Sequence, residues 1–521
     1  MSSQDKLRQE LQELSPAQLR ELLSVSGHGQ LLRREEEKES GPSAVDQQLV
    51  TAAKDEGNAF FRLGRMEDAV SAYSRCIEMD PNNAVCLSNR AAAYLKLKQF
   101  DLAIVDCTKA IEANPTIKVS VIYILSCCFL PDVVFKPLMR RATASIALQQ
   151  YGQAVTDLVA AMAFEPRNKE CRAKLRVIVD TATDVKQREN GADVELRKAG
   201  VHAASILSVC DGWVKSAVRG NPGPAAVNGH TLFRGDNDRI YLFGGRAVRE
   251  QKPDVFVLDE NDDSSWDRVL TRGADTPSSR AWHSTSAIGG KERDIQCMYG
   301  GVSSRGEDSS VYLLVPASSR GYQWVQPRCL QDPKQVPVPR SGHAMVSVVE
   351  DNGDRAVFLF GGRTKRGVND QLLVLRHPPR LILFGGNGQL NDDRMNDVWL
   401  FDLEKQLWTL LQCCGDIPLP RSYHTAHTIG EFLFVIGGRT AEAEDDSMYM
   451  LDIGTAEWFK LPIPIDHGLT PRAWHSSVLT KSGKLFVLGG GTYHGPLKDA
   501  ATLDLSYFQT KASLLNHIAI E

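Results

Sequence analysis

Apolar residues recur at two different spacings along the chain, and the spacing changes near residue 211. From residue 47 to about 210, alanine, aromatic and leucine residues return every three or four positions, which is the period of amphipathic helices. From about 211 onward, short β-branched and aromatic runs end in Gly-Gly, as in Tyr241-Leu-Phe-Gly-Gly. Such runs, with turn residues between them, predict strands. The pattern therefore predicts a multidomain protein with a helical first part and an all-β second part.

Residues 1–46 predict an accessory helix followed by a charged linker. Leucines at helical spacing form a stripe that is interrupted at Ser15-Pro16. The charged run from Arg33 to Glu39 then leads into Ser40-Gly41-Pro42, a composition typical of solvated linkers. Because this segment begins with polar residues, it does not have the pattern of a secretory signal peptide.

The helical part repeats with a period of 34 residues. Small residues that let paired helices approach closely, and prolines that end each pair, recur at this spacing. The matched positions are Gly57 and Ala91, Phe60 and Tyr94, Ala69 and Ala103, Tyr73 and Cys107, and Pro81 and Pro115. This pattern resembles the tetratricopeptide repeat. The resemblance implies an N-terminal α-solenoid of three repeats over residues 47–168, with residues 169–210 as capping helices and linker.

The third repeat is out of step with the first two by 17 residues. Ala154 and Pro166 follow Ala103 and Pro115 by 51 residues, which is 34 plus 17. The apolar stretch 119–135 has this length, so we interpret it as an insertion within the repeats, placing Pro137 near the first turn of the next helix. Retained intron or variant exon sequence explains such a stretch, and a membrane or partner contact is the alternative.

One set of polar residues lies on the first helices of the three repeats, which line the concave groove of such an array. Lys and Asn lie one turn apart on the first of these helices, Asn on the second, and Lys and Arg one turn apart on the third. The residues are Lys54, Asn58, Asn89, Lys136 and Arg140. All five match the carboxylate clamp of co-chaperone tetratricopeptide domains, which holds a Glu-Glu-Val-Asp tail through charge-assisted hydrogen bonds. Ordinary solvated groove residues are the alternative interpretation.

The second part repeats a different motif. Gly-Gly after an apolar run begins at 244, 300, 361, 385, 437 and 489. Most repeats add a tryptophan on a later strand, followed by Arg-x-x-His. These residues are Trp266, Trp324, Trp408 and Trp458, and Arg280-His283, Arg340-His343, Arg421-His424 and Arg472-His475. Together they resemble the kelch repeat, which implies a β-propeller over residues 211–510 and a C-terminal tail at 511–521.

The kelch spacing is broken once. The pair at 385 follows the pair at 361 after only 24 residues, whereas the other spacings run from 52 to 61. One blade then lacks its outer strand and its neighbour lacks its inner strand, which leaves open sheet edges. The last repeat lacks its tryptophan, and we expect the strand around Trp213 to complete it. These features predict a six-bladed kelch β-propeller with two incomplete blades.

Composition removes several classes of function. A net charge of -4, from 60 basic and 64 acidic residues, lacks the basic excess that is typical of nucleic-acid-binding proteins. The eleven cysteines show no metal-binding spacing and no paired framework, which is typical of a reducing compartment. Arg-x-x-His recurs once per blade, so it predicts a structural role and not a catalytic one. We therefore expect no cofactor, no metal, no catalytic residue and no membrane segment, and a location in the cytoplasm with the nucleus as the alternative.

These expectations combine into one hypothesis. The chain is a non-enzymatic adaptor whose groove binds the acidic tail of a cytosolic heat-shock chaperone and whose propeller binds an unknown protein ligand, a client or complex. The alternatives are a kelch substrate receptor for ubiquitin ligation, an enzyme with a site in the propeller channel, and a general scaffold without tail recognition. Affinity for a short Glu-Glu-Val-Asp peptide separates the scaffold from the adaptor.

Overall fold

The computed structural model describes residues 44–515 apart from short gaps and one long one, which are 114–130, 166–167, 189–193, 217–223, 226, 235–238, 247–253, 259–264, 274, 289–294, 318–320, 328–337, 350–354, 369–371, 375–379, 389–392, 403–406, 464–468 and 481. The expected features at 1–43, 119–130 and 516–521, and at Pro115 and Pro166, lie outside the described residues. The chain divides into two compact units, Met1–Lys174 and Leu175–Glu521.

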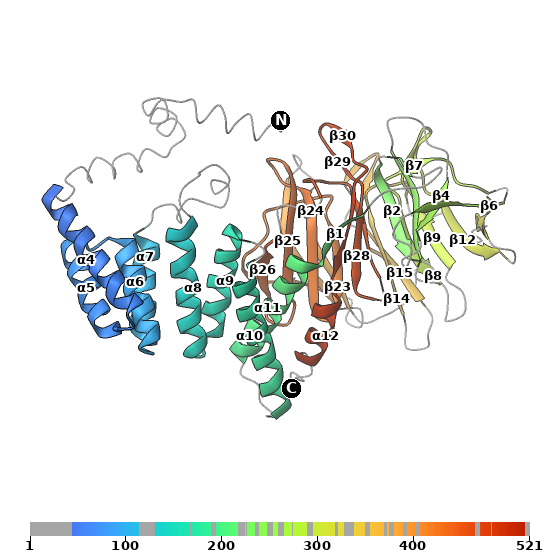
Figure 1. Ribbon diagram of the computed structural model, residues 1–521. Helices are drawn as coiled ribbons and strands as arrows, with labels where there is room; N and C mark the ends of the chain where they lie inside the picture. Colours follow the sequence, from blue (N-terminus) through green and yellow to red (C-terminus); the bar gives the residue numbers. More distant parts are fainter. Residues whose placement is uncertain are drawn as a thin grey trace. The chain divides into compact units, whose positions relative to one another are not determined.

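Three helix pairs form the first unit (Figure 1). The helices are α4 (Ala44–Arg62), α5 (Met66–Met79), α6 (Ala84–Lys96), α7 (Phe100–Glu112), α8 (Pro131–Ala147) and α9 (Tyr151–Phe164). Each helix contacts the next, and α6 contacts α4 and α8, so the first helices of the pairs lie side by side. Gly57 is required at one crossing, since a Cβ there would lie 2.6 Å from the Tyr73 ring. This arrangement is the one that the 34-residue repeat predicts.

Two repeated features confirm the spacing of the third repeat. The turn inside each pair has one residue in the left-handed region, Gly64 (φ 77°), Lys98 (φ 59°) and Gln149 (φ 61°). A buried ion pair also recurs, because Arg90 bonds Asp106 through two nitrogens and Arg141 bonds Asp157 in the same way. The step from the second repeat to the third is therefore 51 residues at every one of these positions.

The structure corrects the expected end of the apolar insertion. Helix α8 begins at Pro131, so residues 131–135 belong to the helix and Pro137 lies inside it, not near its first turn. Val134 explains the earlier start, because it is 5% exposed and continues the buried stripe of Leu138 and Ala142 at four-residue steps. Pro137 has no N–H, so the helix lacks one backbone hydrogen bond at this point.

A second correction concerns the cysteines. Cys76 on α5 and Cys86 on α6 form a disulfide, so the expectation that no cysteines are paired is wrong for these two. Both are fully buried in a core cluster with Val50 and Ala53. The loop between α5 and α6 brings them together, and no short cysteine motif in the sequence marks the pair.

Helices flank the strands of the second unit. These are α11 (Val194–Gly212), α12 (Ser506–Leu515) and, from Leu175 onward, α10 (Lys169–Arg188). Helix α11 packs against α12, and Ser208 Oγ accepts a hydrogen bond from the Phe508 N–H at 3.1 Å. The Phe508 ring contacts Phe432 and Phe434 at centroid distances of 5.3 and 5.1 Å. Helix α12 therefore extends past residue 511, where the C-terminal tail was expected to begin, and it anchors this segment to a sheet.

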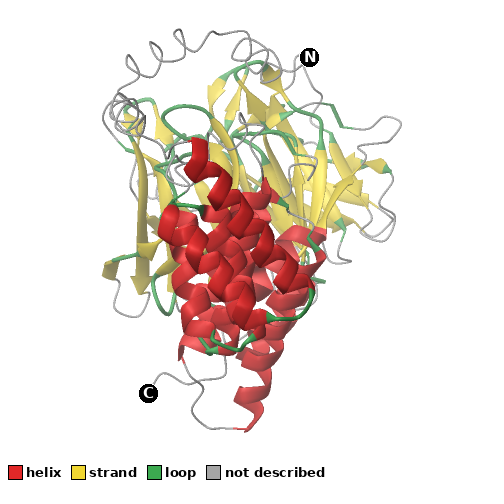
Figure 2. Cartoon of the chain, turned by 60° about the vertical axis from the view of Figure 1, so that its left-hand side comes forward, coloured by secondary structure: helices red, strands yellow, loops and turns green. Residues whose placement is uncertain are grey.

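Six sheets make up most of the second unit, in which the strands lie side by side (Figure 2). The first sheet contains β2 (Asn228–Arg234), β3 (Ile240–Arg246), β4 (Val255–Leu258) and β5 (Trp266–Val269). The second contains β8 (Ser284–Ile288), β9 (Ile295–Tyr299), β12 (Val311–Ala317), β13 (Gly321–Val325) and β6 (Thr271–Arg272). The third contains β14 (Ala344–Val349), β15 (Arg355–Phe360) and β18 (Leu372–Val374).

The remaining sheets follow in chain order. The fourth contains β19 (Arg380–Asn387), β20 (Arg394–Asp402) and β21 (Leu407–Leu411). The fifth contains β23 (Thr425–Ile429), β24 (Phe432–Arg439), β25 (Glu444–Asp452), β26 (Glu457–Leu461) and β22 (Cys414–Gly415). The sixth contains β27 (Ser476–Leu479), β28 (Lys484–Leu488), β31 (Ala500–Asp504) and β1 (Trp213–Ser216). Short strands outside these sheets are β7 (Arg280–Ala281), β10 (Val302–Ser303), β11 (Gly306–Glu307), β16 (Arg363–Thr364), β17 (Gly367–Val368), β29 (Gly491–Thr492) and β30 (Gly495–Pro496).

The sheets bear out two expectations about the broken repeat. The third and fourth sheets have three strands each in the described part of the chain, and they flank the short 24-residue spacing. In the sixth sheet, β1 pairs antiparallel with β31, with Trp213 opposite Leu503. The strand around Trp213 therefore completes the last repeat, as expected.

The recurring kelch residues hold neighbouring sheets together. Tryptophans from later strands pack on aromatic residues of the preceding sheet, as Trp324 does on Phe243 and Trp458 on Phe384, both at 5.1 Å. Histidine rings do the same, as His283 does on Phe243 at 5.3 Å. Strand β2 contacts β8 and β27, β8 contacts β14, and β23 contacts β27. The repeated motif is thus a set of inter-sheet contacts.

Candidate functional site

The five residues singled out in the sequence lie on the three first helices of the first unit. Lys54 and Asn58 lie on α4, Asn89 lies on α6, and Lys136 and Arg140 lie on α8. The asparagine N-cap of α6 fixes where that helix begins, because Asn83 Oδ1 accepts a hydrogen bond from the Cys86 N–H at 3.0 Å. Since α6 contacts both α4 and α8, all five positions belong to adjacent helices.

Three of the five side chains form a continuous hydrogen-bonded line. Asn89 Nδ2 donates to Asn58 Oδ1 at 3.2 Å, and Arg140 Nη1 donates to Asn89 Oδ1 at 3.5 Å. The line therefore runs from α4 through α6 to α8. None of these bonds uses Asn58 Nδ2. The structure brings together the two amides and the arginine that the sequence placed in one site.

Arg140 is the most enclosed cation of the set. Its Nη1 donates to the Ser88 carbonyl at 2.5 Å and to Ser88 Oγ at 2.6 Å. Burial lowers the pKa of Arg140, because the charged guanidinium is withdrawn from water. A guanidinium held in this way has a fixed position, so an anion that meets it loses little of its binding energy to ordering of the side chain.

The two lysines lie at the ends of the line. The Lys54 side chain is 33% exposed, and its Nζ lies 4.0 Å from Asp55 Oδ1. Lys136 is exposed and lies one turn before Arg140 on α8. The lysines are thus more accessible than Arg140, and together the three cations give this face of the helices a positive charge.

Two residues that support the line were not anticipated as site residues. Tyr73 on α5 donates its hydroxyl to Asn58 Oδ1 at 2.8 Å, and Ser88 accepts two hydrogen bonds from Arg140. Burial raises the pKa of Tyr73, while the charge of Arg140 acts in the opposite direction. In the sequence, Tyr73 marked only the repeat period, and the contact with Asn58 depends on how α5 packs against α4.

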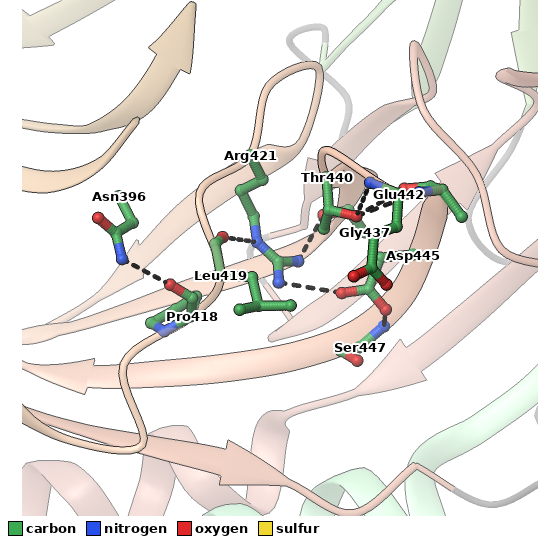
Figure 3. A network of polar contacts seen from close by, with 10 residues as sticks. Asn396, Pro418, Leu419, Arg421, Gly437, Thr440, Glu442, Asp445 and Ser447 are labelled. Carbon is green, nitrogen blue, oxygen red and sulfur yellow. Dashed lines mark hydrogen bonds and ion pairs between the residues drawn. The ribbon is translucent and has the colours of Figure 1, made fainter. Parts of the chain in front are cut away.

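The Arg-x-x-His residues do not form a second polar cluster of this kind. Their arginines are buried, and each guanidinium donates to a Gly-Gly carbonyl, as Arg421 does to Gly437 O at 2.9 Å (Figure 3). Their histidine rings are enclosed between sheets, and burial lowers the pKa of His283 to about 3. Among the described residues, no group of three or more His, Cys, Asp or Glu side chains is arranged to hold a metal ion.

Family comparison defines both halves of the chain. The model of the KLHDC2/KLHL20/DRC7 Kelch-repeats domain matches residues 208–377 and 371–516, which is more than half of the sequence. The chain belongs to this kelch-repeat family. Models of tetratricopeptide repeats match residues 57–98 and 84–117, so the helical part consists of tetratricopeptide repeats. Each matched model describes a repeat, and none describes a catalytic domain.

Relatives resemble separate parts of the chain. RNA polymerase II-associated protein 3 of Homo sapiens is 32% identical over 147 residues, which is 28% of this chain and 20% of that protein. Kelch domain-containing protein 2 of Bos taurus is 30% identical over 225 residues, which is 33% of this chain and 53% of that protein. The chain thus spans about a fifth to about half of the length of these relatives.

A solved structure described as the first TPR of Spaghetti (RPAP3) bound to HSP90 peptide SRMEEVD is 30% identical to the chain. The match covers 26% of this chain and 93% of the chain in that structure, with a TM-score of 0.22. Among the described residues, no helix is both long and apolar enough to cross a membrane.

Proposed function

We propose that this chain is a non-enzymatic adaptor that binds the acidic C-terminal tail of a cytosolic heat-shock chaperone through its tetratricopeptide unit. The observation that carries the proposal is the line Asn58–Asn89–Arg140 across three first helices. Two closely spaced carboxylates, as at the end of a Glu-Glu-Val-Asp tail, need fixed cations and neutral donors together. The amides, Arg140 and the flanking Lys54 and Lys136 provide this combination.

Sequence likeness supports the same assignment. The chain matches RNA polymerase II-associated protein 3 of Homo sapiens at 32% identity over 147 residues, and it is 30% identical to the first TPR of Spaghetti (RPAP3), which is described bound to an HSP90 peptide. That peptide, SRMEEVD, ends in the acidic residues that the five side chains suit. We place the adaptor in the cytoplasm, where such chaperone tails are available.

We further infer that the six kelch sheets close into a six-bladed propeller that binds a client or complex. The support is the succession of inter-sheet contacts, in which β2 touches β8 and β27 while β23 touches β27. Between the third and fourth sheets, Phe358 and Phe401 share one core cluster, and Phe384 and Leu433 share another between the fourth and fifth. Loops at the ends of such strands vary freely on a common fold, so they are where we place the second ligand.

A peptide titration tests the chaperone-tail proposal. The full chain is titrated with a labelled Met-Glu-Glu-Val-Asp peptide and, separately, with the same peptide amidated at its C-terminus. We expect micromolar binding that weakens with salt, because few contacts form and most are charged. Amidation should abolish it, since the terminal carboxylate is the group that the site holds. Equal binding of the two peptides would contradict the proposal.

Point variants locate the binding. Arg140→Ala and Lys54→Ala should each weaken binding by more than about tenfold, because each removes a charge-assisted hydrogen bond of about 1.5–3 kcal/mol. Lys109→Ala is the matched control, since Lys109 is exposed on α7, a second helix, and its removal changes the net charge by the same amount. Equal losses in all three variants would point to nonspecific attraction.

A further inference from the structure

A chain of backbone hydrogen bonds joins the inner strands of five kelch sheets. Trp474 N–H donates to Tyr423 O at 3.2 Å, and Gly229 N–H donates to Trp474 O at 3.0 Å. Trp282 N–H then donates to Gly229 O at 2.7 Å, and Gly342 N–H donates to Trp282 O at 2.8 Å. Each of these five residues lies two positions after the arginine of its motif, or after Val227 in the first sheet. The chain of bonds thus passes through sheets five, six, one, two and three in turn.

The five linking residues share an uncommon backbone conformation. Trp282, Tyr423 and Trp474 have φ values of 58°, 59° and 56°, and Gly229 and Gly342 have 64° and 63°. Left-handed conformations of tryptophan and tyrosine are costly and persist only where the surroundings hold them. The equal conformation at all five positions shows that each inner strand enters its sheet in the same way. A sixth inner strand would need the same backbone conformation and the same two hydrogen bonds.

Within the residues that the structure describes, the fourth sheet contributes no such strand. Its first strand is β19, which lies at the edge of the sheet, whereas the equivalent β24 of the fifth sheet is paired on both sides. Leu381, Ile382 and Leu383 of β19 are only half-buried, while the corresponding Leu433, Phe434 and Val435 of β24 are buried. For the described residues, the chain of bonds ends at Gly342 O on one side and Tyr423 N–H on the other. We call the place beside β19 between these two groups the open strand position.

The open strand position also has acceptors suited to a guanidinium. In the fifth sheet, Arg421 donates to Gly437 O at 2.9 Å and lies 2.9 Å from Asp445 Oδ2 (Figure 3). In the second sheet, Arg280 makes the same pair of contacts with Gly300 O and Asp308, both at 3.0 Å. In the sixth sheet, Arg472 donates to Gly489 O at 2.8 Å and pairs with Asp499.

The fourth sheet repeats these acceptors without the arginine. The strand register locates the matching aspartate. In the sixth sheet Asp499 precedes Ala500, which lies opposite Leu488, and in the fourth sheet Asp397 precedes Val398, which lies opposite Phe384 in the same way. Asp397 is half-buried and accepts a hydrogen bond from Trp399 Nε1 at 2.6 Å, and no arginine from an inner strand of its own sheet reaches it in the described part of the chain. A strand placed here would bring the missing guanidinium.

We propose that the open strand position binds an extended segment of a partner protein that carries Arg-x-x-His followed by small and polar residues. Its arginine would pair with Gly385 O and Asp397, its third residue would bond Gly342 O and Tyr423 N–H, and its strand would pair with β19. The chain's own inner strands indicate the composition, as in Ser476–Leu479 and Thr425–Ile429. Main-chain pairing gives such strand addition its affinity, and the side chains give it specificity.

A second copy of the chain is a poor donor for this position. The strands that follow its Arg-x-x-His motifs are β8, β14, β23 and β27, and each is already paired within its own sheet. Giving one up would open a complete sheet in the donor in order to fill one in the acceptor. A segment of another protein carries no such cost, and it is the occupant that we propose.

Fluorescence anisotropy on the full chain tests this inference. The probe is a labelled peptide with the sequence of residues 472–479, Arg-Ala-Trp-His-Ser-Ser-Val-Leu. We expect saturable binding that weakens by roughly tenfold when glutamine replaces the peptide arginine, because a charge-assisted pair is lost. Asp397→Asn should weaken binding of the arginine peptide to a similar degree and should leave binding of the glutamine peptide unaffected. Asp267→Asn, which removes an exposed aspartate from β5, should change nothing.

Three results would overturn the inference. They are absence of saturable binding, equal affinity for the arginine and glutamine peptides, and a dimer in light scattering that the peptide does not dissociate. A variant with this eight-residue strand inserted before Arg380 provides an independent check. It should lose affinity for the free peptide and melt at a higher temperature than the original chain, and retained peptide binding would contradict the proposed position.

Discussion

At the scale of single residues, the two units depend on arginines that are buried with partners. Arg141 bonds Asp157 through two nitrogens, and the Asp157 side chain is only 1% exposed. Arg65 and Asp68 also form a pair, but their side chains are 58% and 45% exposed. The buried pair has replaced its water contacts with one geometry, so removing either member leaves an uncompensated charge. The exposed pair retains its solvent.

This difference predicts unequal effects of the same substitution. Asp157→Asn should lower the free energy of unfolding of the helical unit by about 3–5 kcal/mol, because Arg141, whose side chain is only 16% exposed, loses its carboxylate partner. Asp68→Asn is the matched control and should change it by less than about 1 kcal/mol. Urea denaturation followed by helical circular dichroism measures both. A loss in Asp157→Asn no larger than in the control would contradict this account of Arg141.

At the scale of elements, helix α12 is the least expected part of the fold. The sequence predicts a tail from residue 511, yet Phe508 is fully buried and Ala512 is 3% exposed. Ten residues with one apolar turn give a weak helical signal, and the helix owes its stability to packing on Phe432 and Phe434. Tertiary contacts of this kind cannot be inferred from local periodicity.

Removing the Phe508 ring tests the anchoring of α12. Phe508→Ala should destabilise the strand unit by about 3–5 kcal/mol, since it leaves a cavity against two aromatic rings. Tyr507→Ala, at a neighbouring position that is 36% exposed, should cost much less. Thermal unfolding monitored by tryptophan fluorescence reports on the sheets. If both variants melt together with the original chain, α12 contributes no stability to the sheets.

At the scale of the whole molecule, the two sequence repeats predict more of the fold than of the candidate site. The 34-residue step and the Gly-Gly spacing located the helix pairs and the sheets, including the completion of the sixth sheet by Trp213. The five proposed site residues followed from the same repeat. The repeat does not predict side-chain contacts between helices, because the Tyr73–Asn58 hydrogen bond and the Cys76–Cys86 disulfide depend on interhelical packing. The sequence does not predict the early start of α8, because an apolar stretch is compatible both with an insertion and with a buried helix.

The buried histidines give the strand unit a distinctive response to acid. Burial lowers the pKa of His230, His283 and His343 to about 3 and that of His424 to about 4, whereas unfolded histidine titrates near its ordinary 6.5. Below about pH 6.5 the unfolded chain therefore binds more protons than the folded one, and acid favours unfolding. Burial raises the pKa of Asp445, but Arg421 and the hydrogen bonds with Ser447 together hold that pKa below its ordinary 3.8, so the contribution of Asp445 is lost only at lower pH.

Stability should therefore be nearly constant above about pH 7 and should fall steadily from about pH 6.5 to about pH 4.5, a range in which histidines and not carboxylates are responsible. Urea unfolding by tryptophan fluorescence across this range gives the slope. His283→Gln should reduce the slope of the free energy of unfolding against pH by up to about 1.4 kcal/mol per pH unit, which corresponds to one proton. This expectation holds independently of any change in stability at pH 7. His494→Gln, at an exposed position, should leave the slope unchanged. A slope that His283→Gln does not alter would show that the enclosed rings are not the groups that acid titrates.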